Sequence, residues 1–177
     1  MALMAEGILK LHWDQTIPVN VAHIVKAMGV RLLLMPEIAP CALLSINTSN
    51  QAQIRLNPAL GALHQRYVVA HALAHVALHH LRPGMQRAIE ISPDFRLDFS
   101  QRHMAEANDF ALRLLMPDAA LHYAVGAMQA RDAQELAHVF AVDALFVKQR
   151  MAELGLAFAR PVPIHQRGFT IDLDELD

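Results

Sequence analysis

One segment of the chain limits the fold more than any other. From Leu63 to Leu81 the sequence is rich in alanine and leucine, and apolar residues would lie on most sides of a helix formed by it. A helix of this kind is expected inside a hydrophobic core rather than on a surface. A chain of 177 residues is long enough to build such a core as one compact domain.

The same segment carries four of the chain's eleven histidines, between positions 71 and 80. His71 and His75 are four residues apart, so their imidazoles lie on one face of the helix and could bind a single metal ion. The spacing alone suits a pair of hydrogen-bonded core histidines equally well. Two observations favour the metal. Buried imidazoles are costly unless their nitrogens are satisfied, and a later helix offers the carboxylates of Glu106 and Asp109.

The remaining pattern predicts helices around a few short strands. Helices are expected from Pro18 to Met28 and from Gln101 to Met116. Three strands are expected between them, at Val30–Met35, Ala42–Asn47 and Ala52–Leu56.

Two further predicted helices, Asp132–Phe140 and Asp143–Leu154, have the spacing of a helix–turn–helix. Their charges are balanced, and the whole chain has a formal charge of −2. Phosphate contacts dominate the affinity of proteins for DNA, so we expect these helices to pack in the core or to dock a protein partner, and we expect no nucleic acid partner.

Composition also limits where the chain acts. The content of hydrophobic residues is 54%, but the longest apolar run, Tyr67–Leu81, is interrupted by histidines, so no membrane span is predicted. The first residues lack the pattern of a signal peptide. A single cysteine, Cys41, excludes an internal disulfide and fits a cytoplasmic location.

Two segments resemble the motifs of one enzyme family. Residues 66–79, RYVVAHALAHVALH, resemble the R-F-T-x-A-H-E-L-G-H-x-L-L-H signature of ImmA/IrrE-type metallopeptidases. Residues 106–111, EANDFA, followed by LLMP at 114–117, are similar to the E-A-N-x-F-A…L-L-M-P segment of that family. The likeness runs from about Ile17 to Pro117.

This resemblance implies an α+β fold, a small zincin-like domain in which a short three-stranded sheet packs on the buried metal-binding helix, with C-terminal helices added. We expect residues 1–130 to form the metallopeptidase domain, and residues 131–177 to form a helical extension with an acidic tail packed on the same domain. The resemblance also implies Zn²⁺ held by His71, His75 and Glu106, with the fourth position left for water, as in catalytic zinc sites.

The sequence departs from the family at the residue that should activate water. In H-E-x-x-H enzymes the glutamate after the first histidine takes a proton from water and passes it to the leaving amine, and here that position is Ala72. Alanine is an excellent helix former, so the fold should tolerate it. Because positioned acid–base catalysis is worth roughly 10²–10⁴-fold, turnover should be nearly silent.

Two origins of Ala72 are open. It is either a deliberate replacement of glutamate, made to hold an enzyme inactive, or a natural loss in a metal-binding pseudoenzyme. A lineage freed from catalysis would be expected to lose the ligands too. Because His71 and His75 remain in place, we favour the deliberate replacement.

Several other polar side chains have open roles. Asp109 could orient a ligand histidine by accepting its second N–H, or it could be a solvated surface residue. His79 and His80 are expected to be structural or exposed. His103 could replace the predicted carboxylate ligand on spacing alone. His122 could stabilise an oxyanion, although an exposed position is the more common reading of such a residue.

The leading hypothesis is a zinc-dependent endopeptidase in a form that lacks its general base. In the family that it resembles, the substrates are typically helix–turn–helix transcriptional repressors of prophages, mobile elements or stress responses. The main rival is a non-catalytic module that holds a regulator or an antitoxin without cleaving it. A weaker rival is a DNA-binding regulator that uses the C-terminal helices.

Overall fold

A computed structural model describes residues 2–39, 41–81, 89–91 and 102–158 of the chain. The helices in these ranges are α1 (Ala2–His12), α2 (Val21–Ala27), α3 (Ala62–Ala77), α4 (Arg102–Leu115), α5 (Asp118–Gly126), α6 (Ala133–Phe140) and α7 (Ala144–Leu154). The strands are β1 (Arg31–Leu34), β2 (Ala42–Ile46), β3 (Ala52–Leu56) and β4 (Ile89–Ile91).

The strands form one mixed sheet in the order β1-β3-β2-β4. Strand β1 runs parallel to β3, with Arg31 opposite Gln53, whereas β2 runs antiparallel to both β3 and β4. The predicted α+β class is therefore confirmed, and the three predicted strands are present. Strand β4 joins them as a fourth strand that the sequence pattern did not reveal.

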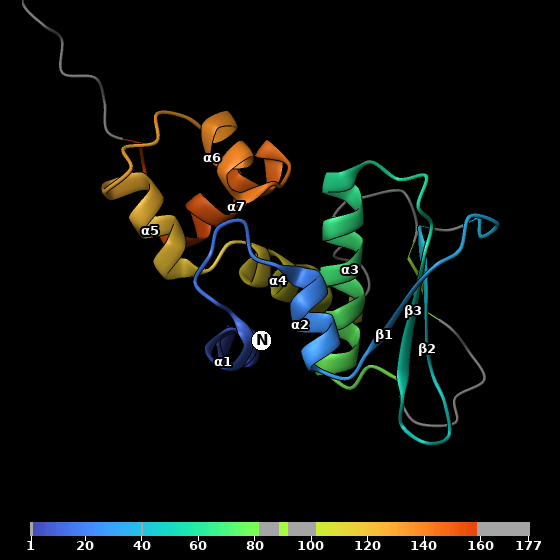
Figure 1. Ribbon diagram of the computed structural model, residues 1–177. Coiled ribbons are helices and arrows are strands. Elements are labelled where there is room, and N and C mark those ends of the chain that lie inside the picture. Colours follow the sequence, from blue (N-terminus) through green and yellow to red (C-terminus); the bar gives the residue numbers. More distant parts are fainter. Residues whose placement is uncertain (1, 40, 82–88, 92–101, 159–177) are drawn as a thin grey trace, which may run out of the picture.

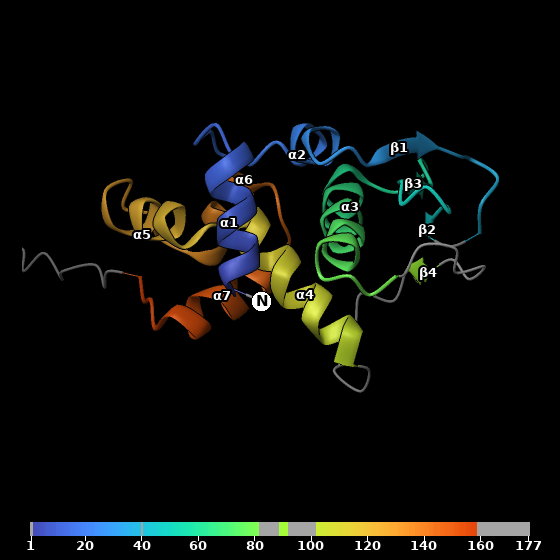
Figure 2. The ribbon, with the colours of Figure 1, turned by 90° about the horizontal axis from the view of Figure 1, so that it is seen from below.

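Helix α3 lies between the sheet and α4 (Figures 1 and 2). On the side of the sheet, β3 alternates buried and partly exposed residues, and its buried residues are Ala52, Ile54 and Leu56. Both Val68 and Leu73 of α3 are completely buried. A helix covered on opposite sides needs apolar residues around most of its circumference, which explains why this segment is not amphipathic.

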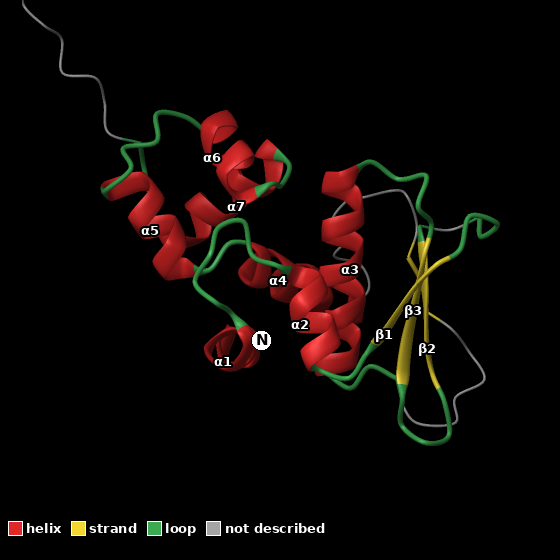
Figure 3. Cartoon of the chain, viewed as in Figure 1, coloured by secondary structure: helices red, strands yellow, loops and turns green. Residues whose placement is uncertain are grey.

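Helices α1, α5, α6 and α7 lie on the far side of α4 from the sheet (Figure 3), whereas α2 lies beside α3 and β1. Helix α1, which the sequence pattern did not predict, buries Ala5, Ile8 and Leu9. Helices α6 and α7 bury apolar residues such as Leu136 and Val147, which supports core packing as their role. None of the helices in the described ranges is long and apolar enough to cross a bilayer.

Arg66 of α3 forms hydrogen bonds with the C-terminal helices, and the neighbouring Tyr67 stacks on Phe146 of α7. The Arg66 guanidinium donates from Nε to the carbonyl of Ala141 at 3.2 Å and from a terminal nitrogen to the carbonyl of Phe140 at 3.4 Å. These carbonyls belong to the C-terminal end of α6, where a helix leaves acceptors unsatisfied. The predicted boundary at residue 130 stays a prediction, and the predicted acidic tail lies outside the described residues.

The C-terminal end of α3 turns the chain back toward the helix. The amide of His79 donates to the carbonyl of Val76 at 3.1 Å, and the amide of His80 donates to the carbonyl of His75 at 3.0 Å. These two bonds define a Schellman motif, in which the residue before the last amide adopts the left-handed conformation. His79 has a φ of +55° and fills that position, which glycine usually occupies. The turn brings His80 back beside α3.

Because His79 adopts a left-handed conformation, we expect His79→Gly to raise the free energy of unfolding by up to about 1 kcal/mol. The β-branched substitution His79→Val should lower it by about 1 kcal/mol or more. Urea unfolding of the two variants and the parent chain measures both effects. Equal stability of the two variants would contradict the role assigned to this turn.

Candidate metal centre

His71 and His75 converge as their spacing predicts. Both side chains project from α3 and are almost completely buried, with 2% and 1% of their surface exposed. Their Nε2 atoms lie 3.1 Å apart, and their ring centroids lie 4.9 Å apart. The two nitrogens that usually bind zinc therefore point toward a common region.

Burial keeps both imidazoles neutral. Desolvation lowers the pKa of His71 to about 4, and the Asn108 side chain partly opposes this shift. Desolvation also lowers the pKa of His75 to about 3, and the neighbouring histidines add to the effect. Only the neutral form of histidine has a lone pair for a metal. The pair is therefore in the protonation state of a ligand at neutral pH.

His80 is the residue of this site that the sequence reasoning missed. Its Nδ1 lies 2.9 Å from Nδ1 of His75, and its Nε2 lies 3.1 Å from Oε2 of Glu106. Burial lowers its pKa, while Glu106 opposes the shift. The helical repeat gave no sign of this contact, because His80 lies beyond the end of α3 and is turned back by His79.

Glu106 is linked to His75 indirectly, because His80 contacts both residues. Its other oxygen, Oε1, accepts from Nε of Arg102 at 2.8 Å, and this hydrogen bond is the main cause of the lowered pKa of Glu106. The ring of His103 stacks on His80 with the centroids 4.3 Å apart. Both residues that could supply the third ligand, Glu106 and His103, are thus in contact with His80.

Tyr67 and Asn108 form a second polar contact near His71. The Tyr67 hydroxyl donates to Oδ1 of Asn108 at 2.6 Å, and both residues are buried. Nδ1 of His71 is buried and has no hydrogen bond of good geometry within the described residues. Burial raises the pKa of Tyr67, so its hydroxyl stays protonated and remains a donor.

Three other predicted residues lie away from the imidazole pair. Both carboxylate oxygens of Asp109 accept from Nε of Arg113, at 2.9 and 3.0 Å. His79 is exposed and forms the turn after α3. His122 is exposed on α5, where its Nδ1 lies 2.7 Å from the carbonyl oxygen of Asp118. His80 thus occupies the place beside His75 for which Asp109 was considered.

The residues present fit a zinc site in part. Two nitrogens bound to one tetrahedral zinc at about 2.0–2.1 Å lie about 3.3 Å apart, close to the separation of the two Nε2 atoms. Two neutral imidazoles and a nearby carboxylate are also a common donor set for zinc. Across the described ranges, however, no three histidine, cysteine or carboxylate side chains already form a metal-binding cluster. The two imidazoles are in place, and the third donor is held by other partners.

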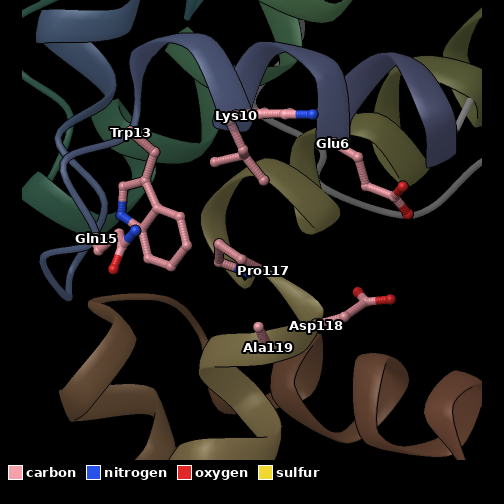
Figure 4. A pocket seen from close by; sticks show the side chains of 8 residues that line it. Glu6, Lys10, Trp13, Gln15, Pro117, Asp118 and Ala119 are labelled. Atoms are coloured by element: carbon pink, nitrogen blue, oxygen red, sulfur yellow. The ribbon is translucent and has the colours of Figure 1, made fainter.

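A cavity of about 440 Å³ lies elsewhere in the molecule, between α1 and the start of α5 (Figure 4). Its lining includes Trp13 and Lys10 on one side and Pro117 and Asp118 on the other. None of the histidines lines this cavity, so it is separate from the candidate metal centre.

The sequence profile of the IrrE N-terminal-like domain, a peptidase family, matches residues 26–152. The chain belongs to this family. The matched range contains α3, α4 and every residue of the candidate metal centre. It also extends through α6 and most of α7. Comparison with curated proteins gives no match.

A solved structure described as a Mycobacterium tuberculosis transcriptional regulator is similar in fold, with a TM-score of 0.59 and 19% sequence identity. The match covers 94% of this chain and 48% of that one, so this chain spans about half the length of the regulator. At this level of identity the likeness concerns the fold alone.

The lowered pKa values predict how the stability of the metal-free chain depends on pH. His71 and His75 stay neutral in the folded chain but take up protons in the unfolded chain below about pH 6.5. Because the unfolded state then binds more protons, the free energy of unfolding falls as the pH falls. We expect the two histidines together to cause a loss on the order of 4 kcal/mol between pH 7 and pH 5, measured by urea unfolding in the presence of a chelator.

The matched control for this prediction is the double variant His71→Gln, His75→Gln. It should lose most of the pH dependence, whatever its absolute stability. If the parent chain and the double variant respond identically to pH, the two histidines are not held neutral by the fold.

Proposed function

We propose that this chain is a zinc-dependent endopeptidase of its family in a form that has lost its general base. The zinc would be held by His71, His75 and Glu106. The observation that carries the proposal is the convergence of the two buried, neutral imidazoles within a chain that belongs to a peptidase family. A hydrogen-bonded core pair would have the same geometry, so membership of the peptidase family is what favours the metal.

Glu106 would have to exchange one of its present contacts to become the third ligand. Its Oε1 accepts from Arg102, whose side chain is 88% exposed, and water screens an exposed ion pair of this kind strongly. Its Oε2 contacts the buried His80. A carboxylate has two oxygens, so Glu106 can give up the exposed contact and keep the buried one.

Peptide hydrolysis would also need a group beside the metal that can accept and deliver a proton. Zinc in such a site supplies a Lewis acid that polarises a peptide carbonyl and the attacking water. Ala72 has no group that can accept or deliver a proton, and its side chain is completely buried. The chain therefore lacks the residue that moves the proton, and we infer that it is inactive.

We further infer that the substrate is a helix–turn–helix transcriptional repressor in the cytoplasm. Membership of the IrrE-type family supports a link to gene regulation, and so does the fold shared with a protein described as a transcriptional regulator. The net charge of −2 and the buried apolar faces of α6 and α7 give no support to direct DNA binding. The partner is therefore inferred to be the repressor protein itself.

Ala72 also favours a second candidate function, a module that binds a regulator or an antitoxin without cleaving it. Under this alternative, alanine would be the residue that the function requires. The two candidates differ in what they predict for a glutamate at this position.

Metal binding is the first test of the proposal. The metal-free chain should bind one equivalent of zinc in competition with a chromogenic chelator, and His75→Ala should weaken binding by more than about 100-fold. Glu106→Gln should weaken binding by about tenfold or more, whereas His103→Ala should leave it nearly unchanged. A larger loss in His103→Ala than in Glu106→Gln would make His103 the third ligand instead.

Restoring the general base is the second test. Ala72→Glu should raise peptide hydrolysis by roughly 10²–10⁴-fold. Mass spectrometry of a panel of helix–turn–helix repressors incubated with the variant measures the cleavage. Ala72→Gln is the matched control, because it has the same size and cannot take a proton. A zinc-loaded Ala72→Glu chain that cleaves none of these proteins would favour the non-catalytic module.

A further inference from the structure

His80 is held in a defined position by contacts at both ring nitrogens. Nδ1 faces Nδ1 of His75 at 2.9 Å, and Nε2 faces Oε2 of Glu106 at 3.1 Å. Its side chain is 5% exposed, and His103 stacks on its ring. The backbone turn at His79 fixes where the ring begins. The imidazole therefore connects α3 to α4 at one point.

Donor and acceptor counting fixes where the hydrogens lie. The ionised Glu106 carboxylate can only accept, so Nε2 of His80 must carry the hydrogen. A neutral imidazole carries one N–H, so Nδ1 of His80 must then accept. Its neighbour at 2.9 Å is Nδ1 of His75, which must donate. His75 is left with its lone pair on Nε2, the nitrogen that faces His71.

We propose that His80 is a positioning residue that, together with Glu106, holds His75 in the tautomer with the hydrogen on Nδ1. The free lone pair on Nε2 of His75 is then directed toward the candidate metal centre before any metal binds. This inference extends the proposed function and rests on it, because the free lone pair has a use only if the site binds a metal. The tautomer itself can be measured on the metal-free chain.

The same counting separates the two histidines of the pair. If Nε2 of His75 carries no hydrogen, the 3.1 Å contact requires His71 to donate from its own Nε2. Nδ1 of His71 then carries no hydrogen, and within the described residues it has no hydrogen-bond partner. The metal-free pair is thus asymmetric. His75 is already in the tautomer of an Nε2 ligand, and His71 must move its hydrogen to Nδ1, which lies on the side of Asn108.

Long-range ¹H–¹⁵N correlation spectra of the uniformly labelled, metal-free chain at pH 7.5 test the proposal. The signals of His75 are assigned by their loss in His75→Gln. We expect His75 to be protonated on Nδ1 and His71 on Nε2. Protonation of His75 on Nε2 in the parent chain would overturn the proposal, and this measurement needs no variant of His80 to fold.

Variants then identify the residue responsible. His80→Ala should leave His75 in a mixture of tautomers, whereas His80→Gln should restore the single form, because its amide can both accept from His75 and donate to Glu106. His103→Ala, which removes only the stacked ring, is the matched control and should leave the tautomer unchanged. An unchanged His75 tautomer in a folded His80→Ala chain would contradict the role of His80.

Zinc affinity separates this inference from the proposed function. His80→Ala should weaken zinc binding by about 10–100-fold, and His80→Gln should recover most of the loss. If the parent chain shows the expected tautomers but binds no zinc, the proposed function fails while the arrangement of hydrogens stands. If the parent chain, His80→Ala and His80→Gln all bind zinc with equal affinity, the proposed function survives and the positioning role is wrong.

Discussion

Helix α3 is packed by the sheet on one side and by α4 on the other, and the remaining elements are arranged around this contact. Completely burying a side chain such as Leu73 stabilises the fold by about 1.5–3 kcal/mol, so the apolar residues of α3 contribute much of the core. The same burial makes every polar group on this helix expensive unless it has a partner. Three of the four ring nitrogens of His71 and His75 face other polar atoms, which offsets much of this cost.

The polar groups of the site form a connected series from the surface to the core. It begins at the exposed Arg102 and continues through Glu106, His80 and His75 to the buried His71. Screening by water decreases along this series, so the inner contacts compete less with water than the outer ion pair does. The exposed end can exchange partners easily, and the buried end is held in one arrangement. This gradient is consistent with a site whose outer carboxylate is adjustable and whose inner imidazoles are fixed.

Residues in regular repeats were predictable from the sequence. The alternation in β3 and the apolar circumference of α3 each follow from the geometry of one element, and the spacing of His71 and His75 follows from the helical turn. His80 was not predictable in this way, because its position depends on a left-handed residue after the helix end. Strand β4 has only three residues, too few to set up a recognisable alternation. The partners of Glu106 depend on the packing of α3 against α4, which no local pattern encodes.

Arg66 gives the fold a further property. It comes from the same helix as the imidazole pair, and it donates to two carbonyls at the end of α6, where Ala141 adopts a left-handed conformation. A chain cut short before α6 would keep every residue of the candidate metal centre but would strand a half-buried guanidinium without its acceptors. The C-terminal helices thus satisfy a charged group on the first turns of α3, the helix that also carries the two histidines.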